Sequence, residues 1–243
     1  MKKALIVGGA NGIGLSIALQ LKDYDQVCIV DKVAPACQLP THYSYEQFDL
    51  MHADYSVFDK YHDVSLLMVT AGFGKLDLFD QISEDQIISY FQVNAIATIR
   101  IIKRFYDRLL GQDDFLCGIM GSIAGFMSSP FLSVYGATKA ALKIFVESVN
   151  VELEKSGSAN CILNVSPGSI PGTCFNGGKN DMSLTEGLAS DIIIHLEAKD
   201  DLFIPKYEEV YRHVLDRYHE DFRAEGRHSY EYKFKSGRIK GQS

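Results

Sequence analysis

Three side chains in the middle of the chain have the types and spacing needed for acid–base chemistry. Ser122 directly follows an apolar run, and Tyr135 and Lys139 lie four residues apart in a helical segment. Residues at that spacing share one helix face, so the lysine ammonium would lie near the phenol. A free tyrosine has a pKa of about 10, and a nearby positive charge favours the phenolate. The trio predicts proton transfer at Tyr135, with a hydrogen bond from Ser122 to the reacting oxygen.

A glycine-rich turn near the start of the chain has the form of a phosphate-binding loop. It stands between an apolar run and a helical pattern, in Val7-Gly8-Gly9-Ala10-Asn11-Gly12-Ile13-Gly14. Glycines allow close approach of a pyrophosphate to the backbone, and a helix N-terminus offers free N–H groups to it. Asp31 ends the next apolar run, where a carboxylate can hold the ribose hydroxyls of a dinucleotide. Because this carboxylate would repel a 2′-phosphate, we predict NAD as the cofactor, with NADP less favoured.

Short apolar runs that alternate with longer helical patterns must position these residues. The predicted strands are 4–7, 27–30, 66–69, 115–120 and 161–165, with 43–48 and 202–204 as additional candidates. They lack strict polar alternation, which is typical of strands covered on both faces. The predicted helices are 13–24, 84–110 and 133–155. This alternation predicts one α/β domain over residues 1–243, with a doubly wound parallel sheet of the Rossmann type and about seven strands.

Two segments fall outside that pattern. Residues 169–185 are rich in Gly, Ser and Asn and follow the predicted strand 161–165. Ligands of such sheets bind on the carboxyl side of the strands, so this segment is a candidate substrate loop. Residues 223–243 are basic and aromatic. We expect them to dock as an extended C-terminal tail on their own or a neighbouring subunit rather than to bind single-stranded nucleic acid.

Composition argues against several classes of partner. The net charge of -7 disfavours a nucleic-acid partner. The five cysteines form no Cys-x-x-Cys pair and the seven histidines are scattered, so we expect no disulfide framework and no metal site. No apolar stretch approaches the roughly 18 residues that a membrane span needs, and the first apolar run is too short for a signal peptide. These features predict a cytoplasmic protein with no membrane partner.

The order of these motifs resembles the short-chain dehydrogenase/reductase family in its compact single-domain form, over nearly the whole chain. The resemblance implies a catalytic set of Asn94, Ser122, Tyr135 and Lys139. Lys139 would also hold the nicotinamide ribose, and Asn94 a water that carries the proton onward. The implied cofactor contacts are Gly8, Asn11, Gly12, Ile13, Gly14, Asp31, Asp49, Leu50, Ala71, Gly72, Tyr135, Lys139, Pro167, Gly168 and Thr173. The chain departs from the family pattern in two places: Val7 stands where Thr is frequent, and Val69 and Thr70 stand where Asn is usual.

The resemblance implies hydride transfer between NAD(H) and a small-molecule alcohol or carbonyl compound. The alternative is a non-catalytic NAD-binding regulatory protein on the same fold, which would not need all four catalytic residues. Apolar residues flank the motifs and predict an apolar rim for the substrate: Phe73, Phe126, Met127, Phe131 and Phe175. Sterols, aromatic ketones, medium-chain carbonyls and sugars all stay open.

The two long predicted helices have more apolar positions than one face of a helix needs. These positions are Ile87, Phe91, Ile99, Ile102 and Phe105 in the first, and Leu142, Phe145 and Val149 in the second. The family resemblance implies that both helices pair with their copies across a two-fold axis. We therefore expect a homo-oligomer, either a dimer or a tetramer.

Overall fold

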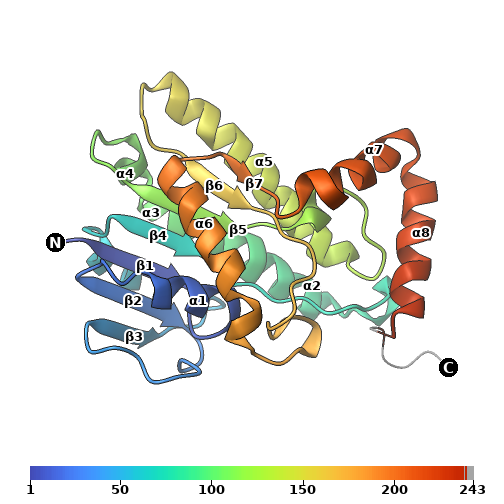
Figure 1. Ribbon diagram of the computed structural model, residues 1–243, viewed down its shortest axis with the longest axis horizontal. Helices are drawn as coiled ribbons and strands as arrows, with labels where there is room; N and C mark the ends of the chain where they lie inside the picture. The colour runs from blue at the N-terminus through green and yellow to red at the C-terminus, as the bar shows by residue number, and fades with distance from the viewer. Residues whose placement is uncertain (238, 240–243) are drawn as a thin grey trace.

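Seven parallel strands form one sheet at the centre of the molecule. The computed structural model describes residues 1–237 and 239, and the strands lie in the order β3-β2-β1-β4-β5-β6-β7 (Figure 1). Their bounds are Lys3–Val7 for β1, Gln26–Asp31 for β2, Tyr43–Gln47 for β3, Leu66–Val69 for β4, Leu116–Met120 for β5, Ile162–Val165 for β6 and Leu202–Phe203 for β7. The chain winds outward from β1 in one direction and from β4 in the other, so the predicted doubly wound sheet is confirmed.

Helices cover both faces of the sheet in two layers. The bounds are Gly12–Gln20 for α1 and Glu186–Ala198 for α6 on one face, and Ala97–Arg104 for α3 and Ser133–Lys155 for α5 on the other. Successive side chains of a strand point to opposite faces, and both Ile6 and Val7 are buried, Ile6 with α1 and Val7 with α5. Burial on both sides explains why the strands appear in the sequence as continuous apolar runs.

The prediction of one continuous helix over 84–110 is wrong. The structure divides this stretch into α2 (Glu84–Phe91), a π-helical turn (Gln92–Ile96), α3 and, after a break, α4 (Tyr106–Leu110). The break falls at Phe105, which leaves helical geometry while its ring stays buried in the core. The π turn contains Asn94, whose side chain is buried. Such turns are frequent at functional sites.

The predicted C-terminal tail, residues 223–243, is helical over most of its length rather than extended. After a second π-helical turn (Tyr207–Tyr211), α7 (Arg212–Glu220) and α8 (Phe222–Lys235) form a hairpin at the carboxyl edge of the sheet (Figure 1). Asp221, between the two helices, caps α8 by accepting hydrogen bonds from the next backbone N–H groups. Residues 238 and 240–243 of the predicted tail lie outside the described residues.

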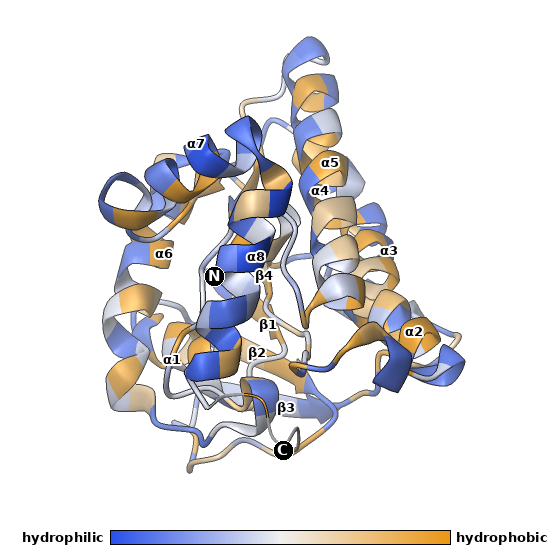
Figure 2. Ribbon diagram, turned by 90° about the vertical axis from the view of Figure 1, so that its right-hand side faces the viewer, coloured by the Kyte–Doolittle hydropathy of each residue, from blue (hydrophilic) through white to orange (hydrophobic). Residues whose placement is uncertain are grey.

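Helix α8 docks on its own chain, on residues 128–131. The rings of Tyr230 and Phe131 have centroids 4.5 Å apart, and Lys233 donates a hydrogen bond to the Pro130 carbonyl at 2.8 Å. Figure 2, which views the carboxyl edge, shows α8 in front of the sheet with a largely hydrophilic outer surface. The C-terminal hairpin therefore supports the segment that joins the end of β5 to α5.

Candidate active site and cofactor site

The glycine-rich turn after β1 packs tightly against the end of β4. Gly8 has a left-handed backbone (φ 85°), and a Cβ atom there would overlap the backbone of Ala71. A Cβ atom at Gly14 would overlap the Gly8 carbonyl oxygen and the Thr70 hydroxyl. The Thr70 hydroxyl donates a hydrogen bond to that carbonyl at 2.9 Å. Packing therefore requires these glycines, and Thr70, a departure from the family pattern, fastens the turn to β4.

The N-terminus of α1 and the carboxylate of Asp31 form the two parts of a dinucleotide cradle. Asn11 precedes the helix without capping it, and the N–H groups of residues 12–14 have no carbonyl partner within the helix. The Asp31 carboxylate accepts hydrogen bonds from the N–H groups of Ala10 at 3.0 Å and Val33 at 3.3 Å. These bonds hold it beside the glycine turn. A helix N-terminus for phosphate and a carboxylate for ribose fit the dinucleotide that the sequence predicts.

Asp49 and Leu50 follow β3 on the same side of the sheet. The Phe48 N–H donates a hydrogen bond to the Asp31 carbonyl at 2.9 Å, which places the ends of β2 and β3 side by side. Leu50 is buried, and its carbonyl accepts a hydrogen bond from the Tyr55 phenol at 2.7 Å. This position is compatible with the adenine contact implied for the pair, which stays a prediction.

Ser122 follows β5 and is held against the start of α5 by two glycines. It precedes a 3-10 turn, Ile123–Gly125. A Cβ atom at Gly125 would come within 2.7 Å of the α5 backbone, and one at Gly136 within 2.9 Å of the backbone of the turn. Only glycines allow this close approach of the turn to the helix. It brings the Ser122 hydroxyl next to the phenol of Tyr135.

Tyr135 and Lys139 lie one turn apart on α5, with the Lys139 ammonium 5.7 Å from the centroid of the Tyr135 ring. Burial raises the pKa of Tyr135 to about 12, although the hydrogen bond with Ser122 partly opposes the rise. Burial also lowers the pKa of Lys139 to about 8, while its Nζ donates a hydrogen bond to the Met120 carbonyl at 2.7 Å. Burial thus outweighs the lowering of the phenol pKa expected from the nearby ammonium, and the phenol keeps its proton at neutral pH.

Asn94 reaches the same region from the π-helical turn. Its amide oxygen accepts a hydrogen bond from the Phe73 N–H and its amide nitrogen donates one to the Phe73 carbonyl, both at 2.9 Å. A Cβ atom at Gly72 would lie 3.3 Å from this amide oxygen and 3.4 Å from the Lys139 Nζ. The structure therefore brings Asn94 and Lys139 together beside Gly72, and all four predicted catalytic residues lie in one region.

Residues 169–185 lie across this region. The ring of Phe175 packs edge-on against the ring of Tyr135, with centroids 5.1 Å apart. A Cβ atom at Gly74 would overlap the Phe175 ring, so glycine makes room for it. The Asn176 N–H donates a hydrogen bond to the Gly74 carbonyl at 2.9 Å. The predicted substrate loop thus places an aromatic side chain directly on the phenol.

Pro167, Gly168 and Thr173 lie where β6 leads into that loop. The Pro167 carbonyl accepts a hydrogen bond from Ser122 at 3.4 Å, and Thr173 packs against the start of α1. The hydroxyl of Tyr211, from the C-terminal hairpin, occupies the space that a Cβ atom at Gly168 would need. No local motif links Tyr211 to Gly168, so sequence reasoning missed this neighbour of the site.

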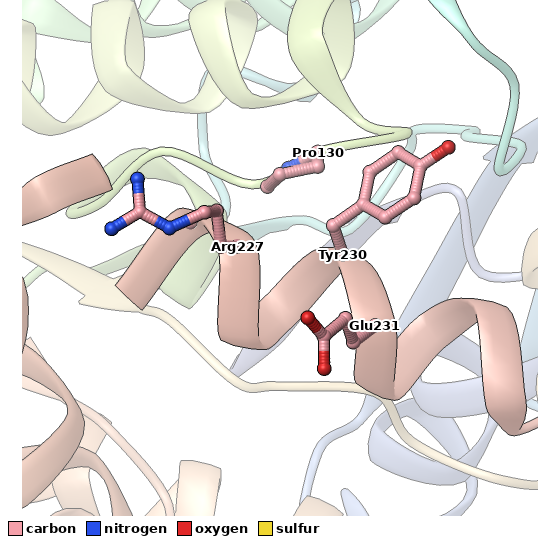
Figure 3. Close-up of a pocket in the computed structure, with 5 residues that line it drawn as sticks. Pro130, Arg227, Tyr230 and Glu231 are labelled. Atoms are coloured by element: carbon pink, nitrogen blue, oxygen red, sulfur yellow. The ribbon is translucent and has the colours of Figure 1, made fainter. Parts of the chain in front are cut away.

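A surface hollow of about 270 Å³ lies between α8 and residues 128–131, apart from the predicted catalytic residues. It is lined by Pro130, Gly226, Arg227, Tyr230 and Glu231 (Figure 3). Pro130 lies over the helix, with Arg227 and Tyr230 on either side of it (Figure 3). None of the predicted site residues lines it.

Two further classes of site can be assessed in residues 1–237 and 239. Among them no group of three or more His, Cys, Asp or Glu side chains is arranged to hold a metal ion. In the same part of the chain, no helix has the length and apolar composition required to cross a membrane. The chemistry that the structure does assemble is the hydroxyl, phenol, ammonium and amide set described above.

Comparison with known proteins identifies the family. The family model described as short chain dehydrogenase matches residues 2–183. Human 17-beta-hydroxysteroid dehydrogenase type 1 is 31% identical over 104 residues, 43% of this chain and 32% of that protein. A probable short-chain type dehydrogenase/reductase, VdlC of Helicobacter pylori, is 24% identical over 173 residues, 68% of this chain and 64% of that protein. The chain thus spans less than two thirds of the length of both relatives.

A solved structure supports the same assignment at the level of the fold. The alcohol dehydrogenase of the archaeon Thermococcus sibiricus, complexed with 5-hydroxy-NADP, superposes with a TM-score of 0.68 at 19% identity. The superposition covers 84% of this chain and 95% of that one. Because the family model matches most of the chain, from the glycine turn through the predicted catalytic set to the loop after β6, this protein belongs to the short-chain dehydrogenase family.

Proposed function

We propose that this protein transfers a hydride between NAD(H) and an alcohol or carbonyl compound, with Tyr135 as the general acid and base. The observation that supports this most is the meeting of Ser122, Tyr135, Lys139 and Asn94 in one region, on the edge of the sheet that also carries the glycine turn. A protein that only bound the dinucleotide would not need Ser122 beside the phenol of Tyr135.

Each residue has a separate task in the proposed reaction. The bound dinucleotide supplies or accepts the hydride. In carbonyl reduction, Tyr135 donates its proton to the substrate oxygen while Ser122 donates a hydrogen bond to that oxygen. In the reverse direction Tyr135 accepts the alcohol proton. We assign Lys139 to the nicotinamide ribose and Asn94 to a water that carries the proton onward.

The preference for NAD over NADP is part of the proposal and rests on Asp31. Its carboxylate is fixed by two backbone hydrogen bonds at the end of β2, so it cannot easily turn away from a 2′-phosphate. The archaeal structure that shares this fold holds an NADP derivative, which makes NADP the competing cofactor to test. Calorimetric titration of both dinucleotides should show tighter binding of NADH. In Asp31→Ser the two affinities should converge, and tighter NADPH binding by the natural sequence would rule the preference out.

An apolar alcohol or ketone is the substrate class that we propose. Phe175 covers the Tyr135 ring, and Phe73 stacks on Tyr90 with centroids 4.7 Å apart next to the catalytic Asn94. Aromatic surfaces of this kind favour flat apolar ligands over sugars. The partial similarity to a hydroxysteroid dehydrogenase makes steroid alcohols one arm of the test.

A panel of sterols, aromatic ketones, medium-chain carbonyls and sugars with NADH and NADPH tests the activity, read at the nicotinamide absorbance. Turnover of one apolar class that is lost in Tyr135→Phe supports the proposal. Tight dinucleotide binding without turnover of any member would instead indicate the regulatory alternative.

We also propose a cytoplasmic homo-oligomer, with a contact surface that differs in part from the sequence-based expectation. Four of the residues expected at the contact are buried in the chain's own core: Ile102, Phe105, Leu142 and Val149. The same helical segments instead expose Ile88, Ile96 and Ile144. Exposed isoleucines on adjacent helices are a typical subunit contact. All five cysteines are free, which agrees with a reducing compartment.

A further inference from the structure

The loop between β6 and α6, residues 169–185, spans two parts of the site, and we call it the strap. One part of the strap packs on Tyr135 through Phe175, as described above. Another part lies on the first turn of α1, where Thr173 comes within 3.6 Å of the Cβ position of Gly12. The strap therefore touches both the catalytic phenol and the proposed phosphate-binding helix terminus.

The contact on α1 includes a hydrogen bond to the helix terminus itself. The Gly12 N–H donates to the side-chain oxygen of Asn180 at 2.6 Å. Gly12 is the first residue of α1, so its N–H has no carbonyl partner within the helix. N–H groups at this position are the ones that a phosphate would use. The amide oxygen of Asn180 thus takes the place open to a phosphate oxygen.

The strap holds Asn180 in this position from its C-terminal side. Thr185 ends the strap, and its buried hydroxyl lies 2.6 Å from the hydroxyl of Ser16 on α1. Asp181, directly after Asn180, accepts hydrogen bonds from the N–H and the hydroxyl of Ser183 at 3.1 and 2.7 Å, which fixes the turn. Since the turn is anchored to the same helix that it covers, Asn180 reaches Gly12 without ordering a free chain.

We propose that Asn180 is a determinant of dinucleotide affinity because it competes with the cofactor phosphate for the Gly12 N–H. This inference rests on the proposed function. The cofactor must displace Asn180 to reach the Gly12 N–H. The free energy needed to break the bond between Asn180 and Gly12 therefore weakens cofactor binding. The chain without cofactor therefore keeps its strap seated on α1, and the first step of cofactor binding is release of Asn180.

The test compares Asn180→Ala with a matched control in the same turn, Ser183→Ala. Both changes remove a side-chain hydrogen bond of the strap, but only the first frees the Gly12 N–H. The chain has no tryptophan, so NADH and NADPH binding is best measured by calorimetry. The net contribution of a neutral hydrogen bond corresponds to a factor of about two to ten in affinity. We expect Asn180→Ala to bind NADH more tightly by that factor and Ser183→Ala to bind as the natural sequence does.

A second readout does not involve the cofactor. In the ligand-free protein, hydrogen exchange of the Gly12 amide should be faster in Asn180→Ala than in the other two proteins. Weaker or unchanged NADH binding by Asn180→Ala, or the same gain in Ser183→Ala, would overturn the competition while leaving the proposed function intact. If none of the three proteins binds NADH or NADPH, the proposed function fails and the competition fails with it.

Discussion

Replacing Lys139 with methionine should stabilise the ligand-free protein. The gain in stability should be larger at neutral pH than at alkaline pH. Lys139 is only 3% exposed, and burial lowers its pKa from the ordinary 10.5 to about 8. Between these two values the unfolded chain binds a proton that the folded chain does not. Below pH 8 the buried ammonium stays charged, which lowers the free energy of unfolding. This loss of stability becomes smaller as the pH rises from 8 toward 10.5.

The two pKa values set the size of the effect. The penalty of keeping Lys139 charged is about 3 kcal/mol at pH 7 and about 1.4 kcal/mol at pH 9.5, so about 2 kcal/mol of stability returns over this interval. Lys139→Met removes the titrating group, so the stability of this variant should not show the increase between pH 7 and pH 9.5. The hydrogen bond from Lys139 to Met120 is lost as well. A neutral amine can also donate this hydrogen bond. Its loss therefore lowers the stability of Lys139→Met by a similar amount at both pH values.

Urea denaturation at pH 7 and pH 9.5 measures the difference. The advantage of Lys139→Met over the natural sequence should shrink by about 2 kcal/mol at the higher pH. Lys143→Met is the matched control, because Lys143 lies one turn further along α5 and pairs at the surface with Glu147. Surface pairs of this kind contribute little. An equal gain in stability at both pH values, or the same gain in Lys143→Met, would show that the buried charge of Lys139 does not destabilise the fold.

Three further changes test other parts of the structure. Tyr135→Phe should lower turnover by about 10²–10⁴-fold while NADH affinity in calorimetry is retained, and full turnover on a verified substrate would exclude Tyr135 as the acid. Gly74→Ala should cost about 1–3 kcal/mol in urea denaturation because its Cβ would overlap Phe175, and most of that cost should vanish in a Phe175→Ala background. Equal costs in both backgrounds would disprove the contact. Ile144→Glu should dissociate the proposed oligomer in sedimentation experiments, whereas Val210→Glu, at an exposed apolar residue outside the proposed contact, should not.

Much of the fold could be predicted because buried parallel strands have a strong sequence signature. All seven predicted strands are present, and their ends agree with the prediction to within one residue. The helix predicted over 133–155 has those bounds in the structure. Each of these elements packs on apolar neighbours along its whole length, so local pattern and tertiary burial favour the same conformation.

The features that were missed depend on partners far away in the sequence. The π turn at Asn94 is fixed by hydrogen bonds to the backbone of Phe73, 21 residues earlier. The helix predicted over 13–24 ends at Gln20, where the chain turns and buries Tyr24. Helix α8 has a polar composition that resembles an unstructured tail, but it is stabilised by its docking on residues 128–131. Neither the hydrophobic periodicity of a segment nor a local motif identifies such distant partners.

The predicted catalytic set illustrates the same division. The types and order of Ser122, Tyr135 and Lys139 could be recognised in the sequence, and the structure brings them together. The protonation states could not be predicted from the sequence, because burial raises the pKa of Tyr135 and lowers the pKa of Lys139. The contribution of Thr70 was also hidden, since its hydroxyl bonds to the glycine turn only after β1 and β4 have paired.

The π-helical turn contains one residue that the packing of the α2–α3 segment does not need but that the placement of Asn94 does. In this turn the Ala97 N–H bonds to the carbonyl of Gln92, five residues back instead of four. One residue is therefore surplus to a regular helix. Deleting it would close the turn to a regular helix and leave the core residues Ile101 and Ile102 facing the sheet. Asn94 would lose the position from which its side chain bonds to the backbone of Phe73. A deletion of one residue here should therefore preserve the fold and remove Asn94 from the candidate site.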